Sequence, residues 1–217
     1  MLVNRVMIRN PIVVSPDAAV NEARSLMDRE KIGRLPVLDK TNKLAGIVTK
    51  KDMLKAGPSM ATSLDMYEIS YLLSKIKVKD IMEKQVITVD ENEVVEEAAR
   101  IMADNDISCL PVMRGRGDAA LLVGIITGTD LFHEFINAFG ARHSGVRLTL
   151  SMEERPGQLA KLAGAIAEKG GNIVSFVSSE GDDLSRRRGT YKITGLSRTE
   201  VETVVSSFPN WEVEDLR

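Results

Sequence analysis

The sequence predicts an α/β (α+β) fold built from small domains: two copies of one unit, followed by a different and smaller unit. Short motifs recur after about 75 residues, which indicates an internal repeat. Within each copy, the apolar spacing alternates between that of short strands and that of amphipathic helices. The motifs stop before residue 145. We therefore expect repeat units at 1–56 and 78–140, a helical connector at 57–77, and a separate domain at 145–217.

Composition narrows the classes of function. The 217 residues include 29 basic and 31 acidic side chains, for a net charge of −2, which argues against non-specific binding to nucleic acid or anionic membranes. One cysteine rules out an internal disulfide, and two histidines leave little material for a metal centre or a catalytic relay. The first residues lack the apolar segment of a signal peptide, and no apolar run approaches the roughly 18 residues of a membrane span. We expect a cytoplasmic protein.

The repeat is defined by paired motifs in the same order. Each copy holds Leu-Pro-Val, at 35–37 and 110–112, and Gly-Ile-[Val/Ile]-Thr-x-x-Asp, at 46–52 and 124–130. An extended segment and an amphipathic helix come before these motifs, and a short helix follows the threonine, so each copy reads β-α-β-β-α. A copy of about 50 residues is too small to bury a sufficient core alone, so the two copies should pack as a pseudo-twofold pair.

These motifs resemble a pair of CBS domains, also called a Bateman module, over residues 1 to about 140. The resemblance implies an adenine nucleotide of AMP, ADP or ATP type, bound without covalent attachment. It also implies that the Thr and Asp of each second motif contact the nucleotide, since helix N-terminal amides suit a phosphate and a carboxylate accepts hydrogen bonds from ribose hydroxyls. Apolar strand residues would then sandwich the base. The candidates are Thr49, Asp52, Thr127, Thr129, Asp130, Ile12, Val13, Ile87 and Thr88.

The same residues also have a purely structural explanation. Thr-x-x-Asp at the start of a helix is a capping box, in which the two side chains satisfy unpaired backbone N–H groups. The two explanations are compatible, because a cap can also face a ligand. For the apolar strand residues, the structural alternative is an ordinary place in the core.

The two copies differ in charge. Lys50 and Lys51 lie in the first turn of a predicted helix, where each cation opposes the helix macrodipole by roughly 0.3–1 kcal/mol. A bound phosphate would offset this cost, whereas lysines that point into solvent need no ligand. The second copy has no cation at the positions that match Arg34, Lys50 and Lys51. We therefore expect two unequal clefts, one of which takes a charged adenine nucleotide better, although the sequence does not assign Arg34 and Lys50 to the same cleft.

The tail has its own order of elements, β-α-β-β-α-β, which is typical of a ferredoxin-like plait. Alternating or apolar segments predict strands, and apolar stripes at helical spacing predict helices between them. The strands are expected at 146–152, 172–177, 190–194 and 211–216, and the helices at 159–167 and 198–208.

This segment resembles an ACT domain in the run Arg155-Pro156-Gly157-Gln158-Leu159 and in Gly170-Gly171-Asn172-Ile173. The resemblance implies a small effector, such as an amino acid, near Gly157 and Asn172. The structural alternative is backbone geometry, a tight turn at Gly157 and the start of a strand at Asn172. Two CBS units followed by an ACT domain resemble the acetoin-utilisation AcuB-type proteins over the whole chain, which implies a regulatory role.

Three further features are better explained by structure than by chemistry. Arg186, Arg187 and Arg188 follow two aspartates and are interpreted as a solvated hairpin tip. Cys109 precedes Leu-Pro-Val and is expected to be a small buried hydrophobic residue. The two histidines show no spacing typical of a metal site, so no metal is expected.

The combined prediction is a non-enzymatic regulatory protein that senses an adenine nucleotide in its CBS clefts and a small effector at its ACT domain. We expect a homodimer that acts on a partner protein, without binding a membrane or nucleic acid directly. The alternatives are a scaffold with empty CBS clefts, an enzyme, or a direct DNA-binding regulator. The enzyme is disfavoured because no Walker loop, G-x-S-x-G motif or metal constellation is present. The DNA-binding alternative is disfavoured by the near-neutral charge.

Overall fold

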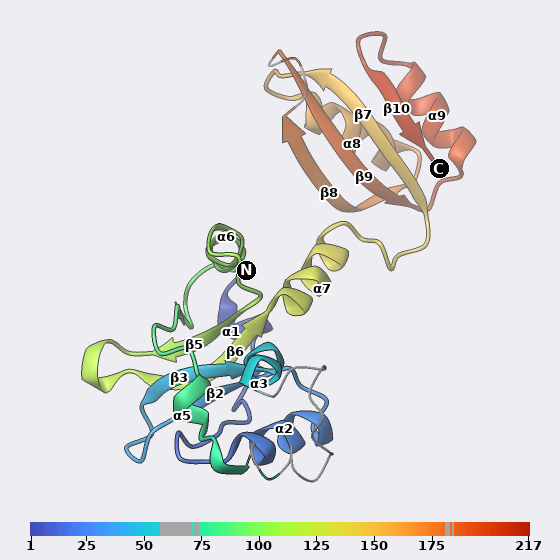
Figure 1. The fold of residues 1–217 in the computed structure, drawn as a ribbon. Helices are drawn as coiled ribbons and strands as arrows, with labels where there is room; N and C mark the ends of the chain where they lie inside the picture. Colours follow the sequence, from blue (N-terminus) through green and yellow to red (C-terminus); the bar gives the residue numbers. More distant parts are fainter. Residues whose placement is uncertain (57–70, 72–73, 181–182, 184) are drawn as a thin grey trace. The chain divides into compact units, whose positions relative to one another are not determined.

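The chain folds into two compact units, Met1–Leu131 and Phe132–Arg217 (Figure 1). The computed structural model describes residues 1–56, 71, 74–180, 183 and 185–217. Most of the predicted connector at 57–77 therefore lies outside the described residues. No helix within the described part of the chain combines the length and apolar character needed to cross a membrane.

The first repeat has the predicted helix, strand pair and short final helix. α2 (Val20–Arg29) precedes β2 (Arg34–Leu38), β3 (Leu44–Thr49) and α3 (Lys50–Ala56). β2 and β3 pair as an antiparallel hairpin. The apolar stripe of α2 packs into the same core as these strands, and its Met27 is fully buried.

The second repeat follows the same plan. Its elements are β4 (Val89–Asp90), α6 (Val95–Asp104), β5 (Cys109–Arg114), the 3-10 helix η1 (Gly117–Ala119), β6 (Leu121–Thr127) and α7 (Gly128–Ala138). β4 runs parallel to β5, and β5 pairs antiparallel with β6. The short helix η1 occupies the loop that lengthens the second copy relative to the first. The β-α-β-β-α interpretation is confirmed for the second copy, whereas in the first copy the extended segment before the helix forms only an isolated parallel bridge between Val14 and Val37.

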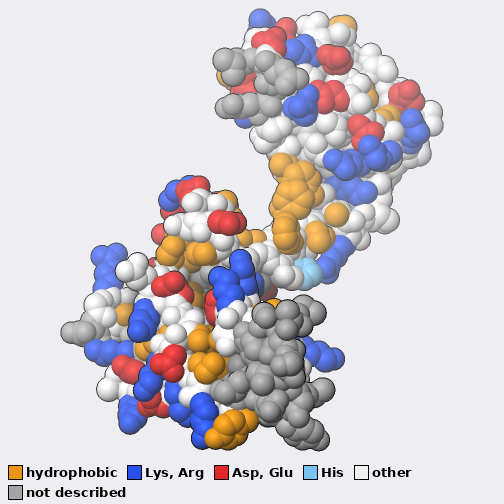
Figure 2. Space-filling view, viewed as in Figure 1, with side chains coloured by type: hydrophobic (Ala, Val, Ile, Leu, Met, Phe, Trp, Pro, Cys, Tyr) orange, Lys and Arg blue, Asp and Glu red, His pale blue; other side chains and the backbone are white. Residues whose placement is uncertain are grey.

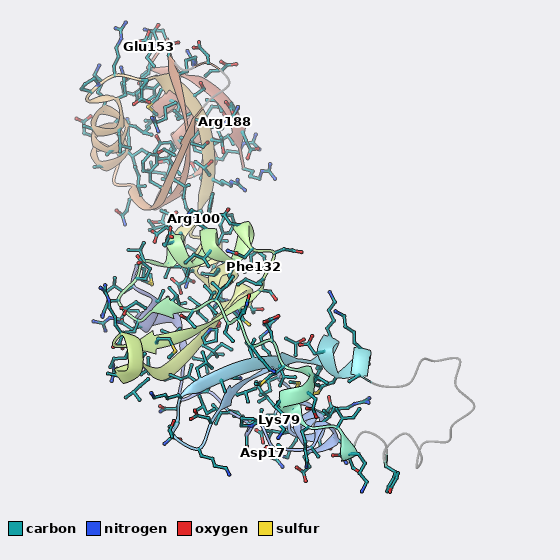
Figure 3. The ribbon with its side chains drawn as sticks, turned by 60° about the vertical axis from the view of Figure 1, so that its left-hand side comes forward. Asp17, Lys79, Arg100, Phe132, Glu153 and Arg188 are labelled. Carbon is teal, nitrogen blue, oxygen red and sulfur yellow. The ribbon has the colours of Figure 1, made fainter. Side chains whose placement is uncertain are left out.

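The segments that precede the two repeats are exchanged between them. The N-terminal helix α1 (Val3–Val6) and strand β1 (Ile8–Arg9) join the second repeat, where β1 pairs antiparallel with β6. In return, α5 (Val78–Ile81) joins the core of the first repeat. An ion pair between Asp17 Oδ1 and Lys79 Nζ, at 2.9 Å, fastens α5 to the loop before α2 (Figure 3). The two repeats are therefore interlocked, and each completes the core of the other.

A glycine in each repeat makes room for the exchanged segment. A Cβ atom at Gly46 would lie 2.6 Å from the sulfur of Met82 and 2.8 Å from the backbone oxygen of Glu83. At the matching position, a Cβ atom at Gly124 would lie 3.0 Å from the backbone oxygen of Ile8. At Gly124 the Cβ atom would also lie 2.4 Å from the sulfur of Met7, so a side chain at either position would force its neighbours to shift. The glycines of the Gly-Ile-[Val/Ile]-Thr motif therefore serve the exchange.

The second unit is a ferredoxin-like plait, as predicted. Its strands and helices are β7 (Val146–Glu153), α8 (Gln158–Glu168), β8 (Asn172–Glu180), β9 (Arg186–Thr194), α9 (Arg198–Ser206) and β10 (Glu212–Leu216). The four strands form an antiparallel sheet in the order β10-β7-β9-β8. Alternate residues of β7 and β9 pack against both helices in one core, which includes Leu148, Leu150, Leu162, Ile193 and Val201.

The interpretation of the three arginines as a solvated hairpin tip is wrong. Arg186, Arg187 and Arg188 are the first residues of β9. Arg186 donates two hydrogen bonds to Ser151, and Arg187 and Arg188 form ion pairs with Glu154 and Glu214. Glu154 and Glu214 are distant in sequence from these arginines, but the register of the sheet places them next to Arg187 and Arg188 and so neutralises their charge. Over the face shown in Figure 2, basic and acidic side chains are likewise interspersed.

Candidate ligand clefts

Each repeat ends in a helix that begins with a capping box. Thr49 Oγ1 donates to Asp52 Oδ2 at 2.7 Å, and the Thr49 backbone N–H donates to the same oxygen at 2.9 Å. Thr127 and Asp130 repeat this arrangement at 2.7 and 2.8 Å. The structural explanation of Thr-x-x-Asp is therefore correct for both copies. In each aspartate only Oδ2 is engaged by described residues, which leaves Oδ1 available to a ligand.

The larger of two clefts in the first unit has a volume of about 650 Å³, which falls within the range of ligand pockets. It is built from both repeats. The first repeat lines the cleft with Gly33, Arg34, Ile47, Thr49, Lys50, Lys51 and Asp52. The segment before the second repeat and the second repeat itself line it with Glu83, Gln85, Val86, Ile87, Asp106, Ile107, Ser108, Cys109 and Pro111. The larger cleft therefore brings together five of the predicted site residues: Arg34, Thr49, Lys50, Asp52 and Ile87.

The smaller cleft has a volume of about 250 Å³ and is also built from both repeats. It is lined by Ile8, Asn10, Pro11, Ile12, Ile32, Gly33, Arg34, Pro36, Ile125 and Thr127. Its lining is mainly apolar, and the guanidinium of Arg34 is its cationic group. Of the predicted site residues it holds Ile12, Thr127 and Arg34, while Thr129, Asp130, Val13 and Thr88 line neither cleft.

Arg34 lies where the two clefts meet. It begins β2, and its guanidinium donates to Ser108 Oγ at 2.6 Å, across from the first repeat to the second. Ser108 was not among the predicted site residues. Its position directly before Cys109, the counterpart of Arg34, was the sequence signal that could have identified it. The structure thus resolves the assignment that the sequence left open: Arg34 and Lys50 line the same, larger cleft.

The cations of the larger cleft have different surroundings. Lys50 Nζ forms an ion pair with Asp28 Oδ1 of α2 at 2.7 Å, and this hydrogen bond holds the pKa of Asp28 below its usual value. The ion pair offsets part of the unfavourable electrostatic energy of placing Lys50 at a helix N-terminus. Lys51 is exposed and has no hydrogen bond or ion pair to any described residue. Lys51 is therefore the cation that a ligand can engage without breaking a contact of the fold.

The predicted base-contacting isoleucines form a symmetrical pair. Ile12 lines the smaller cleft and Ile87 the larger one, and each is 38% exposed. Their matching positions follow from the pseudo-twofold relation of the repeats. A place in the core, the structural alternative for these residues, is therefore wrong for both. Each cleft instead exposes one large apolar side chain at its surface, where a flat ligand can cover it.

Cys109 is buried, as predicted, and it also contributes to the wall of the larger cleft. Burial raises the pKa of its thiol, which keeps the sulfur protonated and unreactive. Among the described residues, no group of three or more His, Cys, Asp or Glu side chains is arranged to hold a metal ion.

The two candidates in the second unit have backbone roles. Gly157 adopts a left-handed conformation, with φ of +88°, directly before α8. Asn172 begins β8 and lies opposite Thr194 of β9. Neither residue lines the pocket of about 320 Å³ in this unit, which lies beside the start of α8 and includes Arg155 and Gln158.

Comparison with known proteins agrees with this architecture. Residues 3–59 and 78–137 match the CBS domain family, and residues 144–213 match the TTHA0829-like ACT domain. Among curated proteins, the chain is 38% identical over 149 residues to an inosine-5'-monophosphate dehydrogenase of Korarchaeum cryptofilum. That alignment covers 69% of this chain but only 27% of the dehydrogenase, so the chain spans about a quarter of that relative's length.

Solved structures with a similar fold cover about two thirds of this chain. The CBS domain pair of protein MJ0100, solved with 5′-methylthioadenosine and S-adenosyl-L-methionine, is 29% identical, with a TM-score of 0.51 over 66% of this chain and 98% of that one. A putative acetoin utilization protein, AcuB, of Vibrio cholerae is 30% identical, with a TM-score of 0.52 over 65% and 95%. CBSX2, solved with AMP, is 28% identical, with a TM-score of 0.50 over 62% and 96%. The chain therefore belongs to the CBS domain family, as a tandem CBS pair followed by a C-terminal ACT domain.

Proposed function

We propose that this protein is a non-enzymatic ligand sensor whose larger CBS cleft binds an adenine nucleotide of AMP, ADP or ATP type. The observation that carries the proposal is the composition of that cleft. It combines a cation without a partner among the described residues, an aspartate with one oxygen available, and an exposed isoleucine. These three groups match the phosphate, ribose and base of a nucleotide.

Each part of the nucleotide has a candidate contact. Lys51 binds the phosphate, with Arg34 and Lys50 adding positive potential nearby. Asp52 Oδ1 accepts hydrogen bonds from the ribose hydroxyls while Oδ2 continues to cap α3. Ile87 packs against the base. The AMP bound to CBSX2 and the adenosine ligands bound to the MJ0100 pair support this choice of ligand class.

The smaller cleft should prefer a ligand with less negative charge. Its volume is less than half that of the larger cleft, and it lacks the counterparts of Lys50 and Lys51. An adenosine-type ligand without a free phosphate fits this lining better than a nucleotide. The protein would therefore bind two related ligands, one in each cleft, or one ligand with two different affinities.

Binding becomes a signal if the ligand prefers one of two arrangements of the protein. Because each cleft contains residues of both repeats, a bound ligand favours one relative placement of those repeats. The proposed output is a cytoplasmic partner protein, reached by a homodimer whose ACT domains bind a small effector such as an amino acid. A role in acetoin utilisation, by analogy with AcuB, is part of this proposal.

Calorimetric titration with AMP and with adenosine tests the proposal on the full-length protein. Lys51→Ala should weaken AMP binding about fivefold, equivalent to about 1 kcal/mol for an exposed charge pair, and should leave adenosine binding unchanged. Lys55→Ala is the matched control, because Lys55 lies in the last turn of the same helix and does not line the cleft.

Two results would count against the proposal. Two sites of equal affinity for AMP would contradict the inequality of the clefts. Absence of binding by AMP, ADP, ATP and adenosine at millimolar concentration would favour a scaffold with empty clefts.

A further inference from the structure

The two clefts of the CBS pair share part of their wall. Gly33 and Arg34 line both clefts, and no other described residue that lines one of them also lines the other. Because Gly33 has no side chain, Arg34 is the shared side chain that a ligand in either cleft can contact. A shared cation gives the two clefts a means to influence each other.

The backbone on either side of the shared wall is fixed. The C=O of Gly33 accepts the N–H of Lys50 at 3.0 Å, which ties the start of β2 to the start of α3. Ser108 is held in the same way, since its C=O accepts the N–H of Gly128 at the start of α7, also at 3.0 Å. With both backbones fixed, the long side chain of Arg34 is the part of this wall that can move.

In this structure the guanidinium of Arg34 is held on the side of the larger cleft. Its Nη2 donates to Ser108 Oγ at 2.6 Å, and Ser108 lines the larger cleft but not the smaller one. Burial raises the pKa of the neighbouring Cys109 thiol, and the positive charge of Arg34 opposes that rise. Cys109 also lines the larger cleft alone. The hydrogen bond to Ser108 therefore favours the larger cleft as the place where this charge acts.

This contact has no counterpart in the other repeat. Cys109 occupies the position that matches Arg34, and Gly33 occupies the position that matches Ser108. A cysteine supplies no cation and a glycine has no side-chain acceptor, so the reciprocal hydrogen bond cannot form. The pseudo-twofold symmetry of the clefts is therefore broken at this position, where a single arginine serves both.

The guanidinium of Arg34 retains most of its capacity to bind an anion. Among the described residues it forms no ion pair with a carboxylate, and Ser108 Oγ is its hydrogen-bond acceptor. A guanidinium has several N–H donors but one positive charge, and it binds a phosphate best when two N–H groups point at the same anion. Two phosphates on opposite sides of the wall would therefore compete for the same group.

We infer that Arg34 couples the two clefts, so that a ligand with a phosphate in one cleft weakens the binding of a second such ligand in the other. The inference rests on the proposed nucleotide binding and adds its regulation. A neutral adenosine places no demand on the guanidinium, so it is compatible with a nucleotide in the other cleft. By thermodynamic linkage the weakening is equal in the two directions. The CBS pair therefore prefers one charged and one neutral ligand to two charged ones.

Isoleucine-methyl NMR on the full-length protein measures binding at each cleft separately, because Ile87 lines the larger cleft and Ile12 the smaller one. Ile87→Val and Ile12→Val assign the two signals, and AMP and adenosine are the probes. Ser108→Ala removes the acceptor that holds Arg34 toward the larger cleft. It should weaken AMP binding at the larger cleft and strengthen it at the smaller one, each by about threefold, which is within the range of one hydrogen bond. Adenosine binding should not change at either cleft.

Replacing the arginine itself provides the second half of the test. Arg34→Met should weaken AMP binding at both clefts by about fivefold, and adding Ser108→Ala to it should change nothing further, since the group that Ser108 holds is absent. Arg116→Met is the matched control, because Arg116 is exposed and lines neither cleft. Ser108 is exposed and Arg34 is half-buried, so neither substitution removes a side chain from the core.

Three results would overturn the coupling. Ser108→Ala could weaken AMP at the larger cleft without strengthening it at the smaller one, as a direct contact between Ser108 and the ligand would. Arg34→Met could affect one cleft alone, or AMP could leave the Ile12 signal unchanged in every variant. Each of these results leaves nucleotide binding in the larger cleft intact. If neither AMP nor adenosine shifts either isoleucine signal at millimolar concentration, the proposed function is overturned together with the coupling.

Discussion

Replacing Gly46 with alanine should destabilise the interlocked CBS pair by about 1–3 kcal/mol. The new methyl group would lie 2.6 Å from the sulfur of Met82 and 2.8 Å from the backbone oxygen of Glu83. The methionine side chain is flexible and can move, but the Glu83 backbone cannot move without loss. Its N–H and C=O exchange two hydrogen bonds with Ile47, each of 2.9 Å. Losing both, at about 0.5–1.5 kcal/mol each, gives the stated magnitude.

Urea denaturation at equilibrium measures this effect. Gly33→Ala is the matched control in the same repeat, because nothing lies within 4 Å of its Cβ position, and it should stay within about 0.5 kcal/mol of the parent. Adding Met82→Ala to Gly46→Ala should recover little, since the backbone contact remains. If Gly46→Ala proves as stable as the parent, or if Met82→Ala restores it fully, the backbone exchange at Glu83 does not hold the repeats together.

Two further predictions concern ion pairing and capping. The hydrogen bond from Lys79 lowers the pKa of Asp17 below 3.8, and the same contact raises the pKa of Lys79 above 10.5. The ion pair should therefore stabilise the fold between pH 3.8 and pH 10.5. This stabilisation should be lost as the pH falls through the pKa of Asp17 or rises through the pKa of Lys79. Melting temperatures of the parent and Lys79→Met that differ equally at pH 2 and pH 7 would contradict this. Ser197→Ala removes the N-cap of α9, whose Oγ accepts from the Glu200 N–H at 3.3 Å. It should cost about 0.5–2 kcal/mol in urea denaturation, and Ser206→Ala, in the last turn of α9, should cost distinctly less.

The sequence was sufficient for the features that depend on local pattern. Apolar spacing located α2 and α6, and the Thr-x-x-Asp motifs located the capped starts of α3 and α7. The order of elements in the tail was sufficient for its plait. In each case the pattern repeats within a few residues, so neighbouring side chains reveal the structure.

Features that join distant segments could not be predicted in this way. The pairing of Ile8 with Ile125, which begins the exchange, has no local signal. For the same reason the contact between Arg34 and Ser108 was missed. The arginines of β9 were misplaced because the glutamates that neutralise them come from other strands.

The exchange of segments also sets the order in which the parts of this protein can fold during synthesis. The core of the first repeat is incomplete until α5, which supplies Val78, has left the ribosome. Strand β1 has no partner until β6 is made, more than a hundred residues later. Contacts between such distant residues slow folding, because a long stretch of chain must be closed before they form. The nascent chain therefore holds β1 unpaired until β6 has been made, so β1 reaches its place only after most of the first unit has been synthesised.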